Sequence, residues 1–146
     1  MTAGDFVRRS ADARLHGTSQ GDGPLVLLLH AGRERRQVWF PVMDELTANY
    51  RIRCVAVDQR GHGDSTGVAT DLRSFGQDVE NLLADQRDPC VIVGSSLGGM
   101  AAMTALAATP VRSVVAGLVL VDVVPDPDPE VARRYLGGRG LLEGGN

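Results

Sequence analysis

The sequence predicts an α/β fold in which a mostly parallel sheet carries helices on both faces. Short runs of Val, Leu and Ile alternate along the chain with segments whose apolar residues recur at helical spacing. That alternation is typical of parallel strands joined by helices. The chain has 146 residues, of which 43% are hydrophobic, and this suffices for one domain with a buried core.

Each expected element follows from a local pattern. Residues 6–16 and the loop 17–23 are predicted to form an N-terminal hairpin region. Apolar runs predict strands at 25–29, 52–57, 90–94 and 114–121. Helical spacing predicts helices at 37–46, 71–83 and 97–108, and Asp71 is placed to cap the second of them.

The stretch Gly-Ser-Ser-Leu-Gly-Gly at 94–99 joins a β-branched run to the predicted helix 97–108. A sharp strand-to-helix turn has no room for side chains two residues before and after its central serine, and the chain has Gly94 and Gly98 there. Ser96 would then expose its hydroxyl at the top of the sheet, and the amide of Leu97 would face a developing oxyanion. Ser96 is the candidate nucleophile, and the alternative is an ordinary turn with a serine N-cap.

A second loop, His-Ala-Gly, follows the predicted strand 25–29 and leads into the predicted helix 37–46. A loop at that place can supply the second amide of an oxyanion hole. Gly32 or Arg33 is the predicted donor.

A third loop, Asp-Gln-Arg-Gly-His-Gly-Asp-Ser, follows the predicted strand 52–57. It combines two glycines with several side chains that can hydrogen-bond locally, so we expect a compact loop that is satisfied internally. Asp58, Arg60 and His62 are assigned a structural role in it.

Taken in their order along the chain, these three motifs resemble those of the α/β-hydrolase superfamily. Its members often carry an H-G oxyanion loop, a D-x-R-G-H-G-x-S loop and a G-x-S-x-G-G elbow. The resemblance covers roughly residues 6–136. The resemblance is strongest to esterase and perhydrolase-like members that have an H-G-G-G-x-x-R-x-x-W segment. Four residues of this chain match that segment: His30, Gly32, Arg36 and Trp39. Ala31 and Arg33 stand where the segment has two glycines. It implies a truncated α/β-hydrolase fold that lacks the C-terminal strands, because the family normally needs about twice this length.

In that superfamily the triad follows the order Ser, then Asp or Glu, then His. All three histidines, His16, His30 and His62, precede Ser96. We expect His30 and His62 to be held by backbone hydrogen bonds within their loops and His16 to be exposed. Asp122, at the end of the last predicted strand, is the candidate acid, and its alternative role is to bind loop amides. Because a serine without a base is a poor nucleophile, this chain alone is expected to be nearly inactive.

The predicted function is therefore a serine hydrolase that acts on a small-molecule ester or related acyl substrate and is incomplete in this chain. One alternative is perhydrolysis or C–C hydrolysis on the same scaffold. Another is a noncatalytic truncated fragment or pseudoenzyme. No cofactor is expected, and no spacing of Cys and His suits a zinc site.

Residues 1–125 are predicted to form the partial hydrolase core. Residues 126–146 change composition, with an acidic Pro-rich linker, the expected start of a cap region and a Gly-rich tail. The strand 114–121 would then be an edge strand. A long apolar edge invites pairing with another chain, so self-association through this strand is expected.

All 15 basic residues are arginines, and they are scattered along the sequence. Together with the net charge of −3, this argues against nucleic acid as a partner. No apolar run approaches the roughly 20 residues of a membrane span, and no signal peptide pattern opens the chain, so a cytoplasmic protein is expected. Cys54 and Cys90 are expected on the strands that flank the strand 25–29, too far apart for a disulfide. Both are predicted to be buried free thiols.

Overall fold

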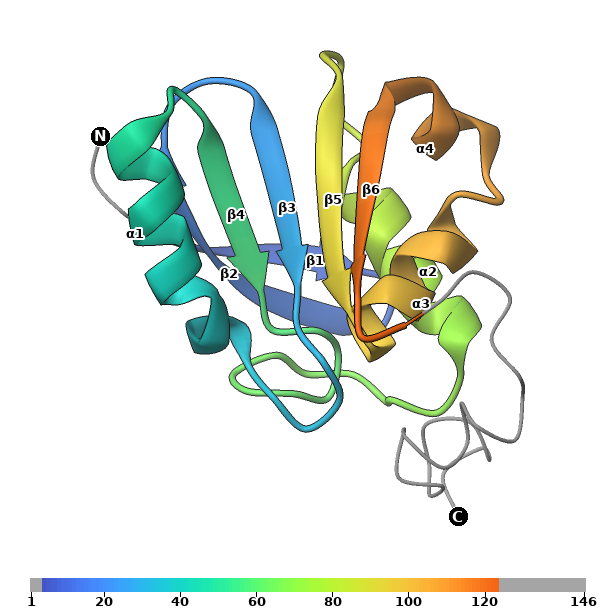
Figure 1. Ribbon diagram of the computed structural model, residues 1–146. Coiled ribbons are helices and arrows are strands. Elements are labelled where there is room, and N and C mark those ends of the chain that lie inside the picture. Colours follow the sequence, from blue (N-terminus) through green and yellow to red (C-terminus); the bar gives the residue numbers. More distant parts are fainter. Residues whose placement is uncertain (1–3, 124–146) are drawn as a thin grey trace.

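Six strands form one sheet in the order β1-β2-β4-β3-β5-β6 in the computed structural model, which describes residues 4–123 (Figure 1). The strands are β1 (Gly4–Ser10), β2 (Ala13–Gly21), β3 (Leu25–Leu29), β4 (Arg53–Val57), β5 (Cys90–Ser95) and β6 (Val115–Val121). β1 and β2 form an antiparallel hairpin that joins the edge of β4, whereas β4, β3, β5 and β6 run parallel. The predicted mostly parallel sheet is confirmed.

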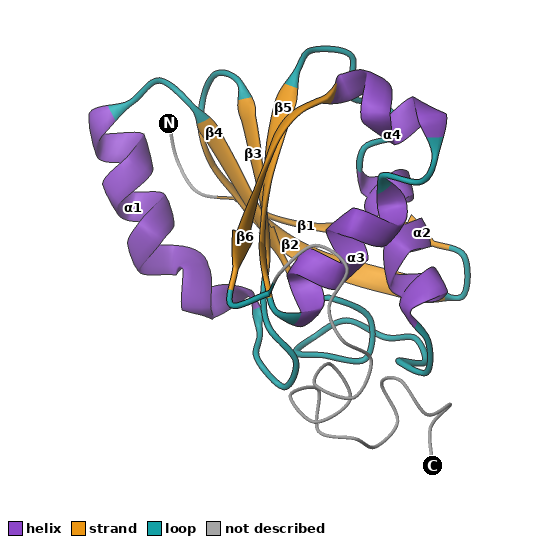
Figure 2. Cartoon of the chain, turned by 45° about the vertical axis from the view of Figure 1, so that its right-hand side comes forward, coloured by secondary structure: helices purple, strands orange, loops and turns teal. Residues whose placement is uncertain are grey.

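Helices pack on both faces of this sheet (Figure 2). They are the short 3₁₀ helix η1 (Arg36–Trp39), α1 (Phe40–Asn49), α2 (Leu72–Leu82), α3 (Leu97–Ala105) and α4 (Thr109–Val114). α1 lies on one face, and α2, α3 and α4 lie on the other. The larger core is on the α2 and α3 side and includes Leu27, Phe75 and Ile92, while the smaller one includes Leu28 and Met43. Adjacent residues of β3 therefore enter opposite cores, which explains why the strand reads as an unbroken apolar run.

The N-terminal hairpin is longer than the sequence predicts. Residues 17–21 were expected in a loop, but they belong to β2 and pair with β4, from Gly17 opposite Val57 to Gly21 opposite Arg53. The glycine pattern misled the prediction because Gly17 serves packing rather than a turn. A Cβ on Gly17 would overlap the ring of Phe6, which crosses over this point of the strand.

The predicted helix 97–108 is also wrong in its length. α3 ends at Ala105, Ala108 is extended with φ −84° and ψ 129°, and a separate helix α4 begins at Thr109. Pro110 lies in the first turn of α4 and cannot donate a backbone hydrogen bond, so it suits a helix start and disfavours a continuing helix. The helix at 71–83 forms as expected, and the Asp71 carboxylate caps it by accepting from the amide of Ser74 at 2.8 Å.

Cys54 and Cys90 are buried free thiols, as predicted. They lie on β4 and β5, on either side of β3. Burial raises the pKa of both thiols, which keeps them protonated and unreactive.

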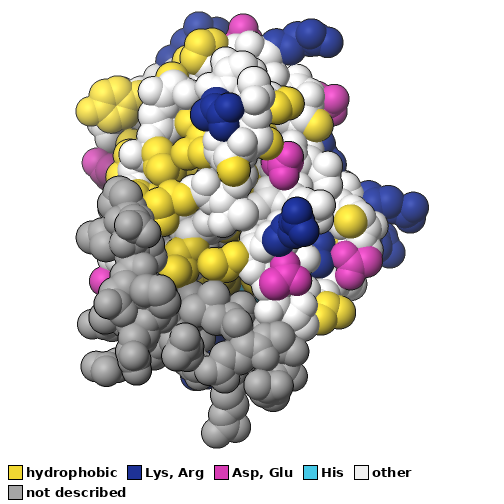
Figure 3. All heavy atoms as spheres, turned by 90° about the vertical axis from the view of Figure 1, so that its right-hand side faces the viewer, with side chains coloured by type: hydrophobic (Ala, Val, Ile, Leu, Met, Phe, Trp, Pro, Cys, Tyr) yellow, Lys and Arg dark blue, Asp and Glu magenta, His cyan; other side chains and the backbone are white. Residues whose placement is uncertain are grey.

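β6 is the outermost strand on its side of the described sheet. It carries no charged residue, and Val119 and Val121 are 49% and 43% exposed. Hydrophobic side chains also gather on the side of the molecule where α3 and α4 lie (Figure 3). β6 lacks the charged residues and prolines that discourage pairing between sheets, although its register with β5 shifts near Val115.

We therefore expect the chain to self-associate through β6, and light scattering measures this directly. Val119→Lys places a charge on the edge and is expected to shift the population toward monomer. Val68→Lys changes a valine of similar exposure, 58% accessible, that lies in the loop between β4 and α2 and not on the edge strand, and it should leave the mass unchanged. A monodisperse monomer for the unaltered chain would contradict the expectation.

The predicted boundary at residue 125 and the linker, cap and tail assigned to 126–146 lie outside the described residues. Within residues 4–123, no helix has the length and apolar character needed to cross a membrane. The same residues contain no cluster of three or more His, Cys, Asp or Glu side chains that could hold a metal ion.

Candidate active site

Ser96 is the single residue between the end of β5 and the start of α3. Its backbone has φ 48° and ψ −108°, a conformation that residues with side chains rarely adopt. Its amide donates to the carbonyl of Val121 at 2.9 Å, and its carbonyl accepts from the amide of Met100 at 3.1 Å. The strained turn is thus held from both sides, by the neighbouring strand β6 and by the first turn of the helix.

Gly94 and Gly98 make this turn possible. A Cβ on Gly94 would lie 2.5 Å from the amide nitrogen of Gly99, and a Cβ on Gly98 would overlap the carbonyl of Leu29, 2.6 Å from its carbon atom. In both cases the obstacle is backbone, which cannot move aside as a side chain can. α3 therefore starts in direct backbone contact with the end of β3.

Leu97 is the first residue of α3, so its amide has no acceptor within the helix. Free amides and the positive end of the helix dipole favour negative charge at this place. Ser96 is only partly buried. Among the described residues, no imidazole hydrogen-bonds to its hydroxyl.

The loop after β3 lies at the same edge of the sheet as the Ser96 turn, where the parallel strands end (Figure 1). Arg33 has φ 67°, and the loop is closed by a hydrogen bond from the amide of Glu34 to the carbonyl of Ala31 at 3.2 Å. The Glu34 carboxylate accepts from the amide of Ala31 at 3.2 Å. Gly32 and Arg33 therefore occupy the bend of a tight turn beside the elbow.

His30 is fully buried, and both of its ring nitrogens are engaged. The amide of Gln59 donates to Nε2 at 2.9 Å, so the proton is on Nδ1, which donates to the carbonyl of Ala31 at 2.7 Å. The Gln59 side chain donates in return to the carbonyl of His30 at 2.6 Å. Burial lowers the pKa of His30 from 6.5 to about 4, so the ring is neutral at physiological pH. His30 thus ties the loop after β3 to the loop after β4.

This lowered pKa makes the stability of the fold dependent on pH. Between pH 6.5 and about 4 the unfolded chain binds a proton at His30 that the folded chain does not, so stability falls as the pH falls through this window. From pH 7 to pH 5 the free energy of unfolding is expected to drop by about 2 kcal/mol from this group. Urea denaturation at the two pH values measures the drop.

His30→Asn removes the titrating ring and is expected to lose most of the pH dependence. His16→Asn, which changes a histidine outside this network, should keep it. An equal drop for the unaltered chain and for His30→Asn would contradict the assignment.

His62 lies beside His30, with ring centroids 5.0 Å apart, and edge-on to Phe75. Its Nδ1 is 2.9 Å from the carbonyl of Arg60. The two loop histidines therefore hydrogen-bond to backbone, as expected from the sequence. His16 is partly buried rather than exposed; it lies opposite Val7 on β1, and its carbonyl accepts from the amide of Asp58 at 2.8 Å.

Asp58 connects the loop after β4 to the start of η1. It is fully buried and accepts from the amide of Arg36 at 2.6 Å, from the Arg36 guanidinium and from the amide of Asp64 at 2.9 Å. Arg36 is 6% exposed and also donates from Nε to the hydroxyl of Thr18 at 3.0 Å. This buried ion pair fixes the end of the loop that contains Gly32 and Arg33.

Arg60 makes a second buried ion pair. Its Nε and Nη2 donate to the two carboxylate oxygens of Asp78 on α2, at 2.7 and 2.9 Å, and Nη1 reaches Asp12 at 3.0 Å. Ser10 donates to the same Asp78 carboxylate at 2.6 Å. Sequence reasoning missed Asp78, whose only signal is a carboxylate on the otherwise apolar face of the predicted helix.

Asp122 follows β6 directly and has φ 58°. Its side chain is exposed, and the preceding carbonyl is the one that accepts from the amide of Ser96. Asp122 therefore borders the elbow. Among the described residues, no hydrogen bond or ion pair joins its carboxylate to another side chain.

Comparison with known proteins agrees with this geometry. Residues 26–144 match the model of a family described as the alpha/beta hydrolase family. The chain belongs to the α/β-hydrolase family. This membership accounts for the parallel sheet, the elbow after β5 and the order of the three loops.

Among its relatives, the chain is 32% identical over 133 residues to a probable protein phosphatase methylesterase 1 of Caenorhabditis elegans, matching 82% of this chain and 36% of the relative. It is 35% identical over 119 residues to the 2-(acetamidomethylene)succinate hydrolase of Mesorhizobium japonicum, and the match covers 76% of this chain and 42% of that protein. The solved structure of a putative aryl esterase from Burkholderia cenocepacia is 28% identical in sequence and has a TM-score of 0.74, and the match covers 87% of this chain and 49% of the esterase. The chain thus spans less than half the length of each of these α/β-hydrolases.

Proposed function

We propose that this chain carries the nucleophile and the oxyanion hole of a serine hydrolase that cleaves carboxylic esters. The observation that carries the proposal is the backbone of Ser96, held at φ 48° between β5 and α3 with both flanking glycines forced by backbone contact. A strained turn is costly, and it is retained where it serves to present a side chain.

In the proposed reaction the Oγ atom of Ser96 attacks the ester carbonyl as a base takes its proton. The tetrahedral oxyanion accepts hydrogen bonds from the amide of Leu97 and from that of Gly32 or Arg33. Its collapse releases the alcohol and leaves an acyl group on Ser96. Water then attacks the acyl carbon, and the carboxylic acid leaves.

An ester substrate is supported by the names of two relatives, a methylesterase and an aryl esterase. The mouse protein phosphatase methylesterase 1, 33% identical over 113 residues, points to the same class. The elbow and the loops are common to several hydrolytic reactions, so the class of bond rests on these relatives.

A general base for Ser96 is not among the hydrogen-bonded groups of residues 4–123. His30 is neutral and bonded at both ring nitrogens, and His62 is bonded through Nδ1 to its own loop. We propose that the base is a histidine outside this chain and that Asp122, beside the elbow, is the acid that orients it. The 146-residue chain should therefore acylate slowly, with the oxyanion hole supplying what catalysis remains.

A fluorophosphonate probe tests the nucleophile, because it forms a covalent bond with an activated serine. Slow labelling of the 146-residue chain is expected, and Ser96→Ala should abolish it. Ser95→Ala changes the adjacent serine at the end of β5 and should leave the labelling rate unchanged.

Each other outcome is decisive. Labelling that survives in Ser96→Ala, or no labelling of the unaltered chain over long incubation, would overturn the assignment of Ser96 and favour a noncatalytic chain. Rapid labelling that depends on Ser96 would support the nucleophile and overturn the proposal that its base lies outside the chain.

A further inference from the structure

Strained backbone is concentrated around Ser96. In the described part of the chain, four residues other than glycine have a positive φ: Ala11, Arg33, Ser96 and Asp122. Ala11 lies in the tight turn between β1 and β2. The other three follow the carboxyl ends of β3, β5 and β6, which are neighbours in the sheet and run parallel. Such a concentration of strain at one edge of a sheet is typical of a functional site.

Arg33 has a positive φ at a position where glycine would carry no strain. The turn from Ala31 to Glu34 is closed by a hydrogen bond from the Glu34 amide to the Ala31 carbonyl, and Arg33, with φ 67°, is its third residue. A positive φ at the third residue of a turn favours glycine. The glycine of this turn, Gly32, stands one position earlier and does not have a positive φ. An arginine kept at a strained position indicates that its side chain has a role.

Arg33 and Ser96 extend from paired positions of neighbouring strands. Leu29 lies opposite Gly94, and the two strands are about 5 Å apart. Arg33 follows Leu29 by four residues and lies in a closed turn, and Ser96 follows Gly94 by two residues. A small ligand that touches the long Arg33 side chain therefore has its other end at Ser96.

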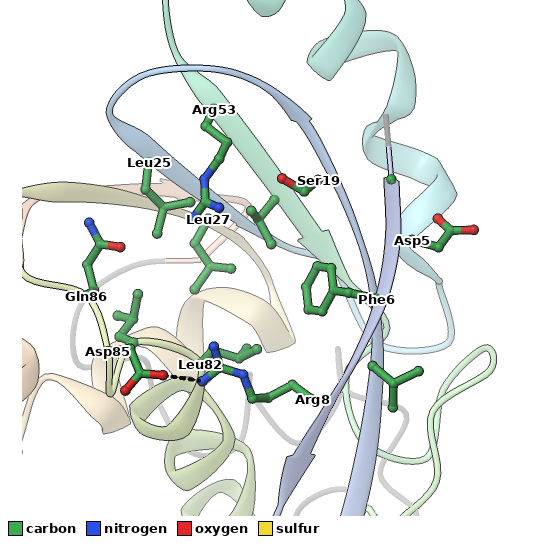
Figure 4. A pocket seen from close by; sticks show the side chains of 14 residues that line it. Asp5, Phe6, Arg8, Ser19, Leu25, Leu27, Arg53, Leu82, Asp85 and Gln86 are labelled. Carbon is green, nitrogen blue, oxygen red and sulfur yellow. Dashed lines mark ion pairs between the residues drawn. The ribbon is translucent and has the colours of Figure 1, made fainter. Parts of the chain in front are cut away.

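The guanidinium of Arg33 is exposed, and within residues 4–123 it makes no ion pair or hydrogen bond. The carboxylate of its neighbour Glu34 accepts from the amide of Ala31 instead. Arg8 shows the contrasting case, beside a cavity of about 600 Å³ at the amino ends of β3 and β4 (Figure 4). Its guanidinium lies 3.8 Å from the carboxylate of Asp85, so it contributes to the fold through a contact that Arg33 lacks.

The charges near Arg33 favour a ligand with a single negative charge. Arg35 is also exposed and without an ion pair among the described residues, so the loop presents two cations. Glu34 lies between them, and the exposed Asp122 borders the elbow on its other side. These two carboxylates repel a dianion more strongly than a monoanion. The two coplanar oxygens of a carboxylate also match the guanidinium fork.

We propose that Arg33 is a specificity residue of the hydrolase site and binds a free carboxylate of the substrate. The inference rests on the proposed function and names its substrate class, the half esters of dicarboxylic acids. The esterified carbonyl lies at Ser96, and the free carboxylate accepts hydrogen bonds from the Arg33 guanidinium. The loop after β3 then serves the site twice, with a backbone amide for the oxyanion and a side chain for the far end of the acyl group.

Binding is measured on the full 146-residue chain with Ser96→Ala, which cannot be acylated at that position, so the test does not depend on catalysis. Monomethyl glutarate is the probe, and methyl valerate, which has a methyl group in place of the free carboxylate, is its neutral counterpart. We expect monomethyl glutarate to bind about fivefold more tightly. Amide shifts in nuclear magnetic resonance spectra should centre on Gly32, Arg33 and Leu97, and high salt should reduce the preference.

Arg33→Gln, made in the same background, should remove most of this preference. Arg35→Gln is the matched control and should keep it, because Arg35 is an exposed arginine of the same loop whose backbone is extended, with φ −149°. Arg33→Gly removes the side chain and relieves the strained backbone, so it should fold and lose the preference as Arg33→Gln does.

Four results would overturn the proposal: no saturable binding of monomethyl glutarate, equal affinity for the two esters, equal loss of preference in Arg33→Gln and Arg35→Gln, or tighter binding of methyl phosphate than of monomethyl glutarate. The fluorophosphonate test of Ser96 is separate. Absent labelling with intact, Arg33-dependent binding would remove the hydrolase function and leave the carboxylate site, whereas labelling without such binding would do the reverse.

Discussion

Gly98→Ala is expected to destabilise the fold by about 3 kcal/mol, because the added methyl group would clash with backbone atoms that cannot easily move. A Cβ at this position overlaps the carbonyl of Leu29, and it lies 2.7 Å from the Leu29 Cβ as well. To make room, α3 would have to move away from β3, although Leu97 and Ala101 are fully buried between the helix and the sheet. The free energy of unfolding, measured with urea, reports the loss.

Gly117→Ala is the matched control for this substitution. Gly117 lies on β6, and a Cβ there would meet only a methyl group of Val91 at 3.6 Å, an ordinary van der Waals distance. Alanine restricts the unfolded chain more than glycine does, so this variant should be stabilised by about 0.5 kcal/mol. Similar free energies of unfolding for Gly98→Ala and Gly117→Ala would show that backbone contact does not fix the elbow.

Local patterns predicted the parts of this fold that local chemistry determines. The parallel strands read as apolar runs because both faces of β3, β4 and β5 are covered, and all four predicted parallel strands formed within a residue of their expected bounds. The turn at Ser96 was readable because only glycine fits at Gly94 and Gly98. Asp71 was readable as a cap because its carboxylate lies three residues before a free amide.

The features that the sequence did not reveal depend on contacts between distant residues. Gly17 and Gly21 suggested a loop, yet β2 continues through them because it pairs with β4, whose residues lie 32 to 40 positions later in the chain. The buried pair of Arg60 and Asp78 joins a loop to a helix, and neither residue has a neighbour in sequence that identifies the other.

The two buried ion pairs give the loops their fixed positions relative to the elbow. Arg36 joins the loop after β3 to Asp58, and Arg60 joins the loop after β4 to Asp78 on α2. His30 links the two loops through the amide of Gln59. The ion pair of Arg36 with Asp58 and the hydrogen bonds of His30 therefore hold in place the loop whose amides are proposed to bind the oxyanion. The side chains of that loop's own bend, Gly32 and Arg33, are not needed for this.

Asp58→Ala is expected to cost about 3–5 kcal/mol, the range for removing one partner of a buried ion pair. The substitution leaves the guanidinium of Arg36, 6% exposed, with Thr18 and the exposed Asp64 as its remaining partners, and it deprives the amides of Arg36 and Asp64 of their acceptor. Asp58→Asn keeps an acceptor oxygen but not the charge, so an intermediate loss of stability is expected. This variant still tests the prediction if Asp58→Ala does not fold.

Asp64→Ala is the control. The Asp64 side chain is 55% exposed and lies 3.2 Å from the same guanidinium, and surface pairs of this kind contribute about 1 kcal/mol or less. Urea denaturation of the three variants measures these differences, and a loss for Asp58→Ala no larger than that for Asp64→Ala would show that the buried pair does not hold the loops in place.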